Sequence, residues 1–366
     1  MKVALLTPGG VDRTGTQRVI PCLLWLIERL VKAGDEVHVF AFSQEPQPGR
    51  WPLLGAQVHN AGRWPRSARV AAMLVAEHRR APFDVLHAFW ALPSGFVGAI
   101  AGRLLRRPLL LTLPGGDVTY LPEIGYGSLG RRRDRLRVRL AAANAGRVTA
   151  PSAFLRDQAM RAGVEAVVLP LGVALDRWPM RPPRPRDVDA PLRLLHVASL
   201  NRVKDQGTLL EAAARLKQSG LGFVLDIIGE DTLGGAVQRR AEALGLAGFV
   251  RFHGGMPHEE LRPWVEQADL LVVSSRNEGA PVAVLEAAVA GVPTVGTAVG
   301  HVADFAPDAA VAVPVGDAAA LADAIARTAG DESDRIRLAR AAQDLALAAD
   351  ADFTAAEFRR LYSELR

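Results

Sequence analysis

The segment from Leu270 to Pro293 limits most strongly which folds this chain can adopt. Its first four residues are all apolar and predict a short buried strand. A polar loop over residues 274–279 follows, and an alanine-rich stretch then predicts a helix that ends at Gly291. A strand, a short loop and a helix in this order are typical of α/β folds with parallel sheets, so the sequence predicts such a sheet here.

Two glutamates flank the start of this predicted helix, Glu278 in the loop and Glu286 within the helix. The N-terminus of a helix carries unpaired N–H groups and a positive dipole end, which favour an anion. Carboxylates beside such a site can accept hydrogen bonds from hydroxyl groups, so the pair suits a ligand that carries both hydroxyls and phosphates. The simpler alternative is a solvated loop acid and a helix acid paired with an arginine.

The same order of elements occurs in both halves of the chain. In the first half, a strand over residues 3–7 precedes a glycine-rich loop and a helix predicted over 17–32. In the second half, a strand over 193–198 precedes a loop that holds Arg202 and Lys204 directly before the next predicted helix. Two cations at such a position suit a diphosphate, and two solvated loop cations are the alternative.

A proline-rich, charged segment over residues 177–191 divides the chain, because proline continues neither a helix nor a central strand. We therefore expect two doubly wound, Rossmann-like domains at 1–176 and 192–350, followed by a C-terminal helix at 351–366. The length of 366 residues and the hydrophobic content of 49% are sufficient for two cores.

The composition limits the cellular compartments and the kinds of site that are expected for this protein. The single cysteine, Cys22, excludes an intramolecular disulfide and fits a reducing compartment. The eight histidines are scattered and form no metal-binding motif with a cysteine. No apolar run has the length of a membrane span, and the N-terminal residues do not resemble a signal peptide. We therefore expect a cytoplasmic protein.

The net charge of +5 is unevenly distributed. Residues 1–176 carry 23 Lys and Arg against 13 Asp and Glu, whereas residues 177–366 carry 21 against 26. The excess is densest between Arg131 and Arg139, a basic helix that could contact anionic lipid or nucleic acid, or be a solvated face. Since no aromatic stripe lies between the arginines, we expect no nucleic-acid partner and consider transient contact with a membrane surface instead.

Two further predicted strands in the first half, one ending near His87 and one over residues 109–113, lead into small polar loops. The second of these loops holds Asp117. Because loops at the carboxyl ends of parallel strands face the binding crevice, we expect His87 and Asp117 to point to one crevice as catalytic candidates. The alternative for His87 is a structural role at the end of a strand.

Together these motifs resemble the family 4 glycosyltransferases, which have the GT-B fold. The resemblance spans nearly the whole chain, and its most specific element is the pair Glu278 and Glu286 with seven residues between them, followed by Gly291-Val292-Pro293. The supporting motifs are the glycine-rich first loop, His87-Ala88-Phe89-Trp90, Thr112-Leu113-Pro114-Gly115-Gly116-Asp117, Ala150-Pro151-Ser152, Leu171-Gly172-Val173, Arg202-Val203-Lys204-Asp205 and Gly229-Glu230.

The resemblance implies transfer of a sugar from a nucleotide-sugar, such as a UDP- or GDP-sugar, with retention of the anomeric configuration. The acceptor would be a hydroxyl of a glycan, a lipid-linked glycan or a small molecule, as in polysaccharide biosynthesis. Neither an essential metal nor a further cofactor is implied. The donor would bind the second domain and the acceptor mainly the first, and the final helix would cross back onto the first domain.

The resemblance also implies roles for individual residues. Lys204 would hold the donor diphosphate with help from Arg202, and Glu286 would bind the ribose hydroxyls. Glu278 would face the donor sugar. The remaining predicted donor-binding residues are Gly9 and Gly10, which would line the pyrophosphate and acceptor side, and Gly229, Glu230, Gly279, Ala280, Pro281 and Val282.

Two positions depart from the family pattern. Pro114 stands where members commonly have a histidine that contacts the sugar near the reacting centre, so His87 or backbone N–H groups would have to replace it. Ser199 stands where an arginine is usual, five positions before Lys204, whereas Arg202 lies two before it.

Two other classes of function stay open. One is a catalytically silent sugar-nucleotide-binding protein, which Pro114 motivates. The other is a GT-B epimerase that acts on a nucleotide-sugar without an acceptor. A nicotinamide-dependent dehydrogenase is disfavoured, because neither half has the glycine fingerprint followed by an acidic residue.

Overall fold

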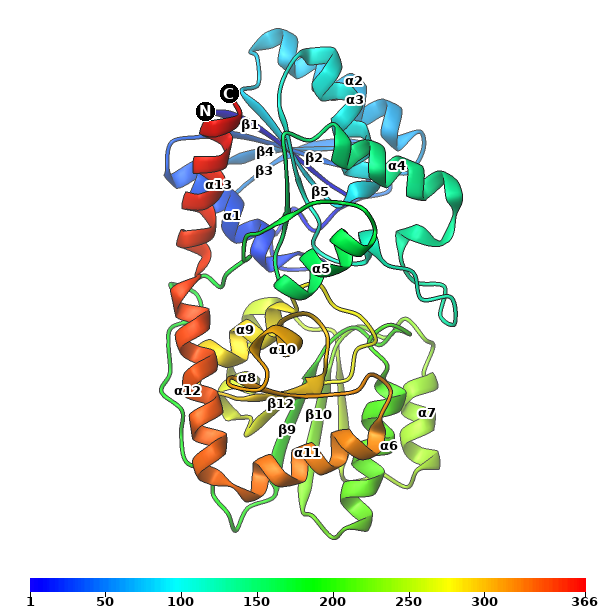
Figure 1. The fold of residues 1–366 in the computed structure, drawn as a ribbon, viewed down its shortest axis with the longest axis vertical. Helices are drawn as coiled ribbons and strands as arrows, with labels where there is room; N and C mark the ends of the chain where they lie inside the picture. The colour runs from blue at the N-terminus through cyan, green and yellow to red at the C-terminus, as the bar shows by residue number, and fades with distance from the viewer. The chain divides into compact units, whose positions relative to one another are not determined.

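The computed structural model describes residues 1–366 and divides into two compact units, each built on its own sheet (Figure 1). Unit 1 comprises Met1–Ala174 together with Ala349–Arg366, and unit 2 comprises Leu175–Ala348. The prediction of an α/β chain with two doubly wound domains is confirmed, because each unit has a parallel sheet with helices on both faces.

The sheet of unit 1 has eight strands in the order β3-β4-β2-β1-β5-β6-β7-β8. All neighbours pair in parallel except β3 and β4, which form an antiparallel hairpin at one edge. This hairpin was not predicted from the sequence, and Pro52 in β3 is tolerated because β3 is an edge strand. The strands are β1 (Lys2–Thr7), β2 (Glu36–Ala41), β3 (Gly49–Leu53), β4 (Ala56–Asn60), β5 (Val85–Phe89), β6 (Leu109–Thr112), β7 (Arg147–Ala150) and β8 (Val167–Val168).

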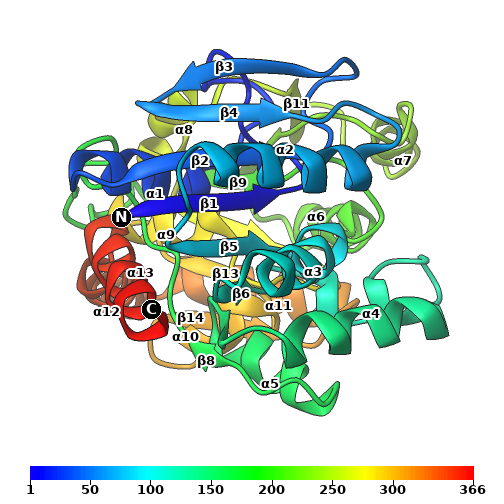
Figure 2. The same ribbon diagram turned by 90° about the horizontal axis from the view of Figure 1, so that it is seen from above.

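Two groups of helices cover the faces of this sheet, each over its own apolar core (Figure 2). One face carries α1 (Pro21–Lys32) and α13 (Ala351–Leu365), and the other carries α2 (Arg66–Arg80), α3 (Phe96–Leu105), α4 (Arg132–Ala143) and α5 (Ala153–Arg161). Short helical turns complete the unit: η1 (Ala91–Gly95), η2 (Gly116–Val118) and η3 (Ser128–Gly130).

The first helix is shorter than predicted. It begins at Pro21 instead of residue 17, and Ile20 before it has an extended conformation. A proline fits the first position of a helix because its missing N–H has no partner there anyway.

The C-terminal helix α13 belongs to the fold of unit 1, as the resemblance implied. Its Phe358 and Tyr362 are fully buried against the sheet. Gly172 allows the chain to approach this helix closely, since a Cβ atom there would lie 2.0 Å from the carbonyl oxygen of Ala349. The amide of Gly172 also donates to Thr354 Oγ1 at 2.9 Å.

The sheet of unit 2 has six parallel strands in the order β11-β10-β9-β12-β13-β14. They are β9 (Leu192–Val197), β10 (Phe223–Ile228), β11 (Val250–Gly254), β12 (Leu270–Val273), β13 (Thr294–Thr297) and β14 (Ala310–Val313). The helical elements are α6 (Gln206–Gln218), α7 (Ala236–Ala243), η4 (His258–Glu260), α8 (Arg262–Gln267), α9 (Val282–Val289), α10 (Gly300–Phe305), α11 (Ala318–Gly330) and α12 (Glu332–Ala348).

The proline-rich segment over residues 177–191 contains no helix or strand and packs on unit 2. Arg335 of α12, which is 2% exposed, donates to the carbonyl oxygens of Arg184 and Asp269 and pairs with Glu332 at 2.7 Å. The guanidinium of Arg184 in turn donates to Gln267 O at 2.6 Å. These bonds fix the segment without regular secondary structure. No helix of the protein combines the length and the apolar character needed to cross a bilayer.

Candidate functional site

Two charged loops of unit 2 meet at the carboxyl edge of its sheet. The strands β9 and β12 are neighbours, so the loops that follow them start side by side. Lys204 Nζ in the first loop lies 2.5 Å from Glu278 Oε1 in the second. Ser275 Oγ donates to the same oxygen at 2.6 Å. The structure thus brings together two residues that sequence reasoning selected 74 positions apart.

Backbone and side-chain bonds hold these two loops in register. Ser274 Oγ donates to the carbonyl oxygen of Lys204 at 2.8 Å, and the amide of Arg276 donates to Val203 O at 2.7 Å. Arg276 Nε lies 3.0 Å from Asp205 Oδ2, and Asp205 caps the start of α6. The position of the Lys204 ammonium is therefore set by the fold. Sequence reasoning missed the roles of Asp205 and Arg276, although an aspartate before a predicted helix is a recognisable cap.

The ion pair of Lys204 and Glu278 is accessible, because the two side chains are 24% and 12% exposed. Both side chains therefore keep part of their surface open to solvent, where a ligand can reach their charges. Arg202 lies in the same loop, is exposed and forms no ion pair with an acidic side chain. The edge therefore offers two cations and one carboxylate to an incoming molecule.

Glu286 is 2% exposed on α9 and does not pair with an arginine. Its Oε1 is hydrogen-bonded to Nε2 of His258, which begins the turn η4 after strand β11. The His258 ring lies 5.7 Å from that of Trp178. Sequence reasoning did not select His258, and its only signal was a short polar stretch after a predicted strand.

The remaining predicted donor-binding residues of unit 2 lie in neighbouring turns. Gly229 and Glu230 follow β10, and a Cβ atom on Gly229 would lie 2.0 Å from Ala198 O, so the loops after β9 and β10 touch. The run Gly279-Ala280-Pro281-Val282 forms the turn into α9. Gly300 packs on that turn, since a Cβ atom there would lie 2.9 Å from Pro281 Cδ. Loops or turns that follow five of the six strands thus lie at this edge: those after β9, β10, β12 and β13, and the turn after β11 that holds His258.

Gly9 and Gly10 lie in unit 1, directly after β1. Gly10 has a φ of +85°, and a Cβ atom would lie 2.3 Å from the side chain of Ile20, so this position requires glycine. Its amide donates to Gln44 Oε1 at 2.6 Å, and the amide of Val11 donates to the same oxygen at 3.0 Å. The Gln44 side chain therefore fixes the shape of this loop.

The expectation that His87 points into a crevice is wrong. The ring is fully buried, with Nδ1 2.7 Å from the hydroxyl of Tyr362 and Nε2 2.8 Å from Thr112 Oγ1. It packs against Phe358 of α13 at a ring distance of 4.7 Å. Burial lowers the pKa of His87 to about 3. Both ring nitrogens are used within the core, so the residue has a structural role.

Asp117 is also buried, at 1% exposure, in the turn after β6. Its Oδ1 accepts a hydrogen bond from the amide of Ala91 at 2.7 Å and so ties this turn to the loop after β5. Burial raises the pKa of Asp117 to about 7, although backbone hydrogen bonds oppose the shift. Asp117 positions two loops and does not share a crevice with His87, which lies among the side chains of α13.

A cluster of His38, His59 and Glu77 in unit 1 offers three ligand atoms within 4.8 Å of one another. His38 Nδ1 lies 3.0 Å from His59 Nε2, and burial lowers the pKa of His59 to about 4. Lys2 Nζ already lies 3.2 Å from Glu77 Oε1. Because the lysine supplies the positive charge at this carboxylate, the cluster is a polar network of the core, in which Nδ1 of His59 has no hydrogen-bond partner.

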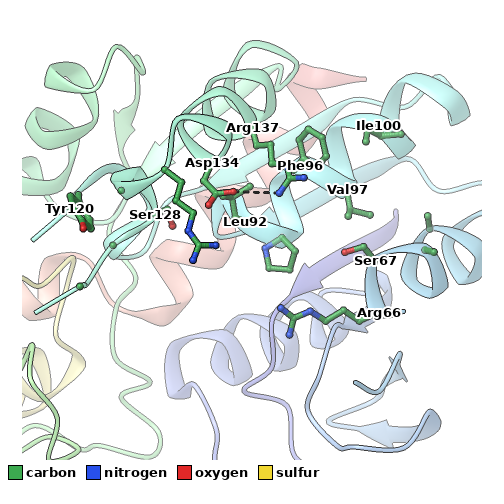
Figure 3. A pocket seen from close by; sticks show the side chains of 17 residues that line it. Arg66, Ser67, Leu92, Phe96, Val97, Ile100, Tyr120, Ser128, Asp134 and Arg137 are labelled. Atoms are coloured by element: carbon green, nitrogen blue, oxygen red, sulfur yellow. Dashed lines mark hydrogen bonds and ion pairs between the residues drawn. The ribbon is translucent and has the colours of Figure 1, made fainter. Parts of the chain in front are cut away.

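A cavity of about 930 Å³ opens in unit 1 among α2, α3, α4 and the loop before η3 (Figure 3). Apolar side chains of Leu92, Phe96, Val97 and Ile100 line one part of it, and three arginines stand among the other lining residues: Arg66, Arg131 and Arg137. Sequence reasoning singled out the basic stretch that begins at Arg131 but not the cavity.

Comparisons with known proteins agree over both units. Residues 19–172 match a family model described as a glycosyl transferase 4-like domain, and residues 181–345 match one described as glycosyl transferases group 1. The putative teichuronic acid biosynthesis glycosyltransferase TuaC of Bacillus subtilis is 28% identical over 281 residues, which are 74% of this chain and 67% of that protein. Matches to AmsK of Erwinia amylovora, EpsF of Bacillus subtilis and a glycogen synthase of Mycobacterium tuberculosis cover 40%, 57% and 43% of the lengths of those proteins.

Solved structures resemble the whole chain. Sucrose-phosphate synthase from Thermosynechococcus elongatus has a TM-score of 0.82 at 20% identity, over 100% of this chain and 98% of that one. HepE of Anabaena in complex with UDP-glucose has a TM-score of 0.77 at 19% identity, and both chains are covered completely. At these identities, the likeness shows the fold that the chains share.

Proposed function

Because the chain belongs to the GT-B glycosyltransferases of the family 4 type, we propose that it transfers a sugar from a nucleotide-sugar held by unit 2 to a hydroxyl acceptor, with retention of the anomeric configuration. The observation that carries this proposal is the contact of Lys204 and Glu278 across β9 and β12. The binding of UDP-glucose by HepE, which shares the fold, supports a donor of this class.

The charges at this edge fit the bond that has to break. Cleavage of the anomeric C–O bond leaves negative charge on a nucleoside diphosphate and positive character on the sugar. Lys204 would leave Glu278 and stabilise the departing diphosphate, with Arg202 and the N-terminus of α9 beside it. One well-placed donor of this kind typically contributes about 3–4 kcal/mol to transition-state stabilisation.

Glu278 would then accept hydrogen bonds from the donor sugar, while Glu286, positioned by His258, would bind the ribose hydroxyls. For the acceptor step we infer attack on the same face of the sugar that the diphosphate leaves. The leaving phosphate oxygen would accept the proton of the acceptor hydroxyl, so that the new glycosidic bond forms as the old one breaks. No pair of carboxylates is assigned to a double displacement.

A catalytically silent sugar-nucleotide-binding protein is the second candidate. Pro114 has no side-chain donor, and the buried His87 cannot take over the role of the missing histidine. In the active enzyme, backbone N–H groups after β6 would have to serve that role.

Two measurements test these proposals. Thermal shift with UDP, GDP, ADP and dTDP identifies the nucleotide, and we expect one of them to stabilise the protein clearly more than the others. The matching nucleotide-sugars are then incubated with hydroxyl acceptors. Formation of an α-linked product from an α-linked donor supports the retaining transferase. Nucleotide binding without turnover on any acceptor supports the silent protein, epimer formation without an acceptor indicates an epimerase, and no nucleotide binding overturns all three.

A further inference from the structure

The cavity of unit 1 combines an apolar wall with cations that have no acidic partner. Arg66 is the first residue of α2, and Arg131 directly precedes α4; both are exposed and neither forms an ion pair with an acidic side chain. Arg137 differs, because it is hydrogen-bonded to Asp134 at 3.4 Å and its guanidinium lies 5.6 Å from the centroid of the Phe96 ring (Figure 3). Two of the three arginines are therefore available to a ligand.

The shape of this cavity is set by the fold. The loop that supplies Tyr120 and Ser128 is closed by a bridge between Leu121 and Tyr126. Gly127 has a φ of +101°, and a Cβ atom there would lie 2.2 Å from Thr119 O, so the loop needs glycine at this point. A preformed wall lowers the entropic cost of binding.

The lining indicates the class of ligand. A volume of about 930 Å³ lies near the upper end of the range for small-molecule pockets. A purely apolar ligand would gain nothing from the charges of Arg66 and Arg131, and a neutral sugar would gain little from Phe96 and Ile100. A molecule with both an anionic group and an apolar chain would satisfy both parts of the lining.

The surface around the cavity indicates where such a molecule comes from. Large apolar side chains are exposed four positions apart on both neighbouring helices: Ile100 and Leu104 on α3, and Leu136 and Leu140 on α4. Trp64, two residues before α2, is 85% exposed. Arginines accompany these side chains along α4. Exposed apolar groups among arginines are typical of surfaces that lie on anionic membranes.

We propose that this cavity binds the phosphate-bearing end of a lipid-linked acceptor, with the phosphate between Arg66 and Arg131 and the adjoining chain against Phe96 and Ile100. This inference rests on the proposed transferase function, for which it names the class of acceptor. The acceptor would enter the cavity from a membrane surface on which α3 and α4 lie.

Binding of a model amphiphile tests the inference. The full-length protein is titrated by calorimetry with dodecyl phosphate, with dodecyl maltoside, which has the chain without the charge, and with methyl phosphate, which has the charge without the chain. All are used below their critical micelle concentrations. The double variant Arg66→Gln/Arg131→Gln is compared with Arg63→Gln/Arg135→Gln, which removes the same charge from exposed arginines outside the cavity. Ile100→Asn provides a second change at the apolar wall.

We expect dodecyl phosphate to bind more tightly than either control molecule. Its affinity should fall at least about tenfold in the cavity double variant and also fall in Ile100→Asn, since charge-assisted contacts and apolar burial each contribute. The variant outside the cavity should bind like the wild type. Equal affinity for dodecyl phosphate and methyl phosphate, or equal loss in both double variants, would overturn the inference.

Binding of the nucleotide selected by thermal shift is measured in the same proteins. If the nucleotide binds and sugar transfer occurs while dodecyl phosphate does not bind in the cavity, the acceptor class is wrong and the transferase stands. If dodecyl phosphate binds as expected but no nucleotide does, the proposed transferase function fails and a lipid-binding cavity remains.

Discussion

The carboxyl edges of the two sheets use polar residues in opposite ways. In unit 2, Lys204 and Glu278 stay partly exposed and pair with each other across two loops. In unit 1, Asp117 follows β6 but is buried, and His87 lies within β5 instead of at its end; hydrogen bonds to their neighbours hold both side chains within the fold. A polar residue at the end of a parallel strand is thus a candidate for ligand binding only where no other element of the fold covers it.

The largest expected effect tests the exposed edge. Lys204→Ala should lower kcat/KM for the nucleotide-sugar by about 10²–10³-fold, because a cation facing the leaving diphosphate is lost. The free energy of unfolding should fall by only about 1–3 kcal/mol, since one charge-assisted hydrogen bond is lost and Glu278 keeps its hydrogen bond from Ser275. Initial rates measure the effect. The control is Lys217→Ala, which removes a lysine of the same unit that is hydrogen-bonded to Gly245 O. Equal rates in the two variants would show that the donor does not bind at this edge.

For the buried His87 of unit 1, we expect substitution to affect stability. His87→Ala should lower the free energy of unfolding by about 3 kcal/mol, because packing is lost and the buried hydroxyl of Tyr362 loses its partner. Denaturant unfolding measures this loss. Activity per folded molecule should be retained. A variant that folds stably but is inactive would return His87 to the catalytic candidates.

The burial of Asp117 should make the free energy of unfolding depend on pH. Burial raises its folded pKa to about 7 from an ordinary 3.8, so the stability that it contributes is present below 3.8 and is lost as the pH rises to about 7. Relative to the wild type, Asp117→Asn should therefore gain about 4 kcal/mol over this range and keep a constant difference at higher pH. Unfolding curves at a series of pH values check the sign. A difference that does not vary with pH would show that Asp117 is ionised in the folded protein.

The smallest expected effect concerns Glu286. Glu286→Gln removes a charged acceptor for ribose hydroxyls and should weaken nucleotide binding about tenfold. Calorimetry with the nucleotide chosen by thermal shift measures the change. Glu260→Gln, at the exposed end of the turn that holds His258, should bind as the wild type does. If Glu286→Gln bound the nucleotide as tightly as the wild type, Glu286 and its hydrogen bond to His258 would have only a structural role.

The sequence was sufficient for the fold because each strand, loop and helix carries its own local signal. The apolar run at Leu270 predicts a strand and the alanine-rich stretch after it predicts a helix, and neither prediction needs residues from elsewhere in the chain. The same is true of β9 and α6. The hairpin of β3 and β4 lacked such a signal, since Gly49 and Pro52 are poor strand formers.

Long-range partners account for the parts of the site that the sequence did not predict. His87 is enclosed by Tyr362, which lies 275 positions further along the chain. The pairing of Glu286 with His258 depends on how α9 packs beside the turn after β11. The cavity around Arg66 and Arg131 needs three helices and a loop to come together. None of these arrangements has a period or spacing that one segment could reveal.

The membership of α13 in unit 1 has a consequence for how the protein is made. Residues 1–174 leave the ribosome before Phe358 and Tyr362, so their sheet lacks part of its apolar cover until α13 has been synthesised. Unit 2 is continuous in sequence and is complete earlier. Of these two units, the one whose strands are translated first is therefore the last to finish folding, in contrast to the usual N-terminal-first order.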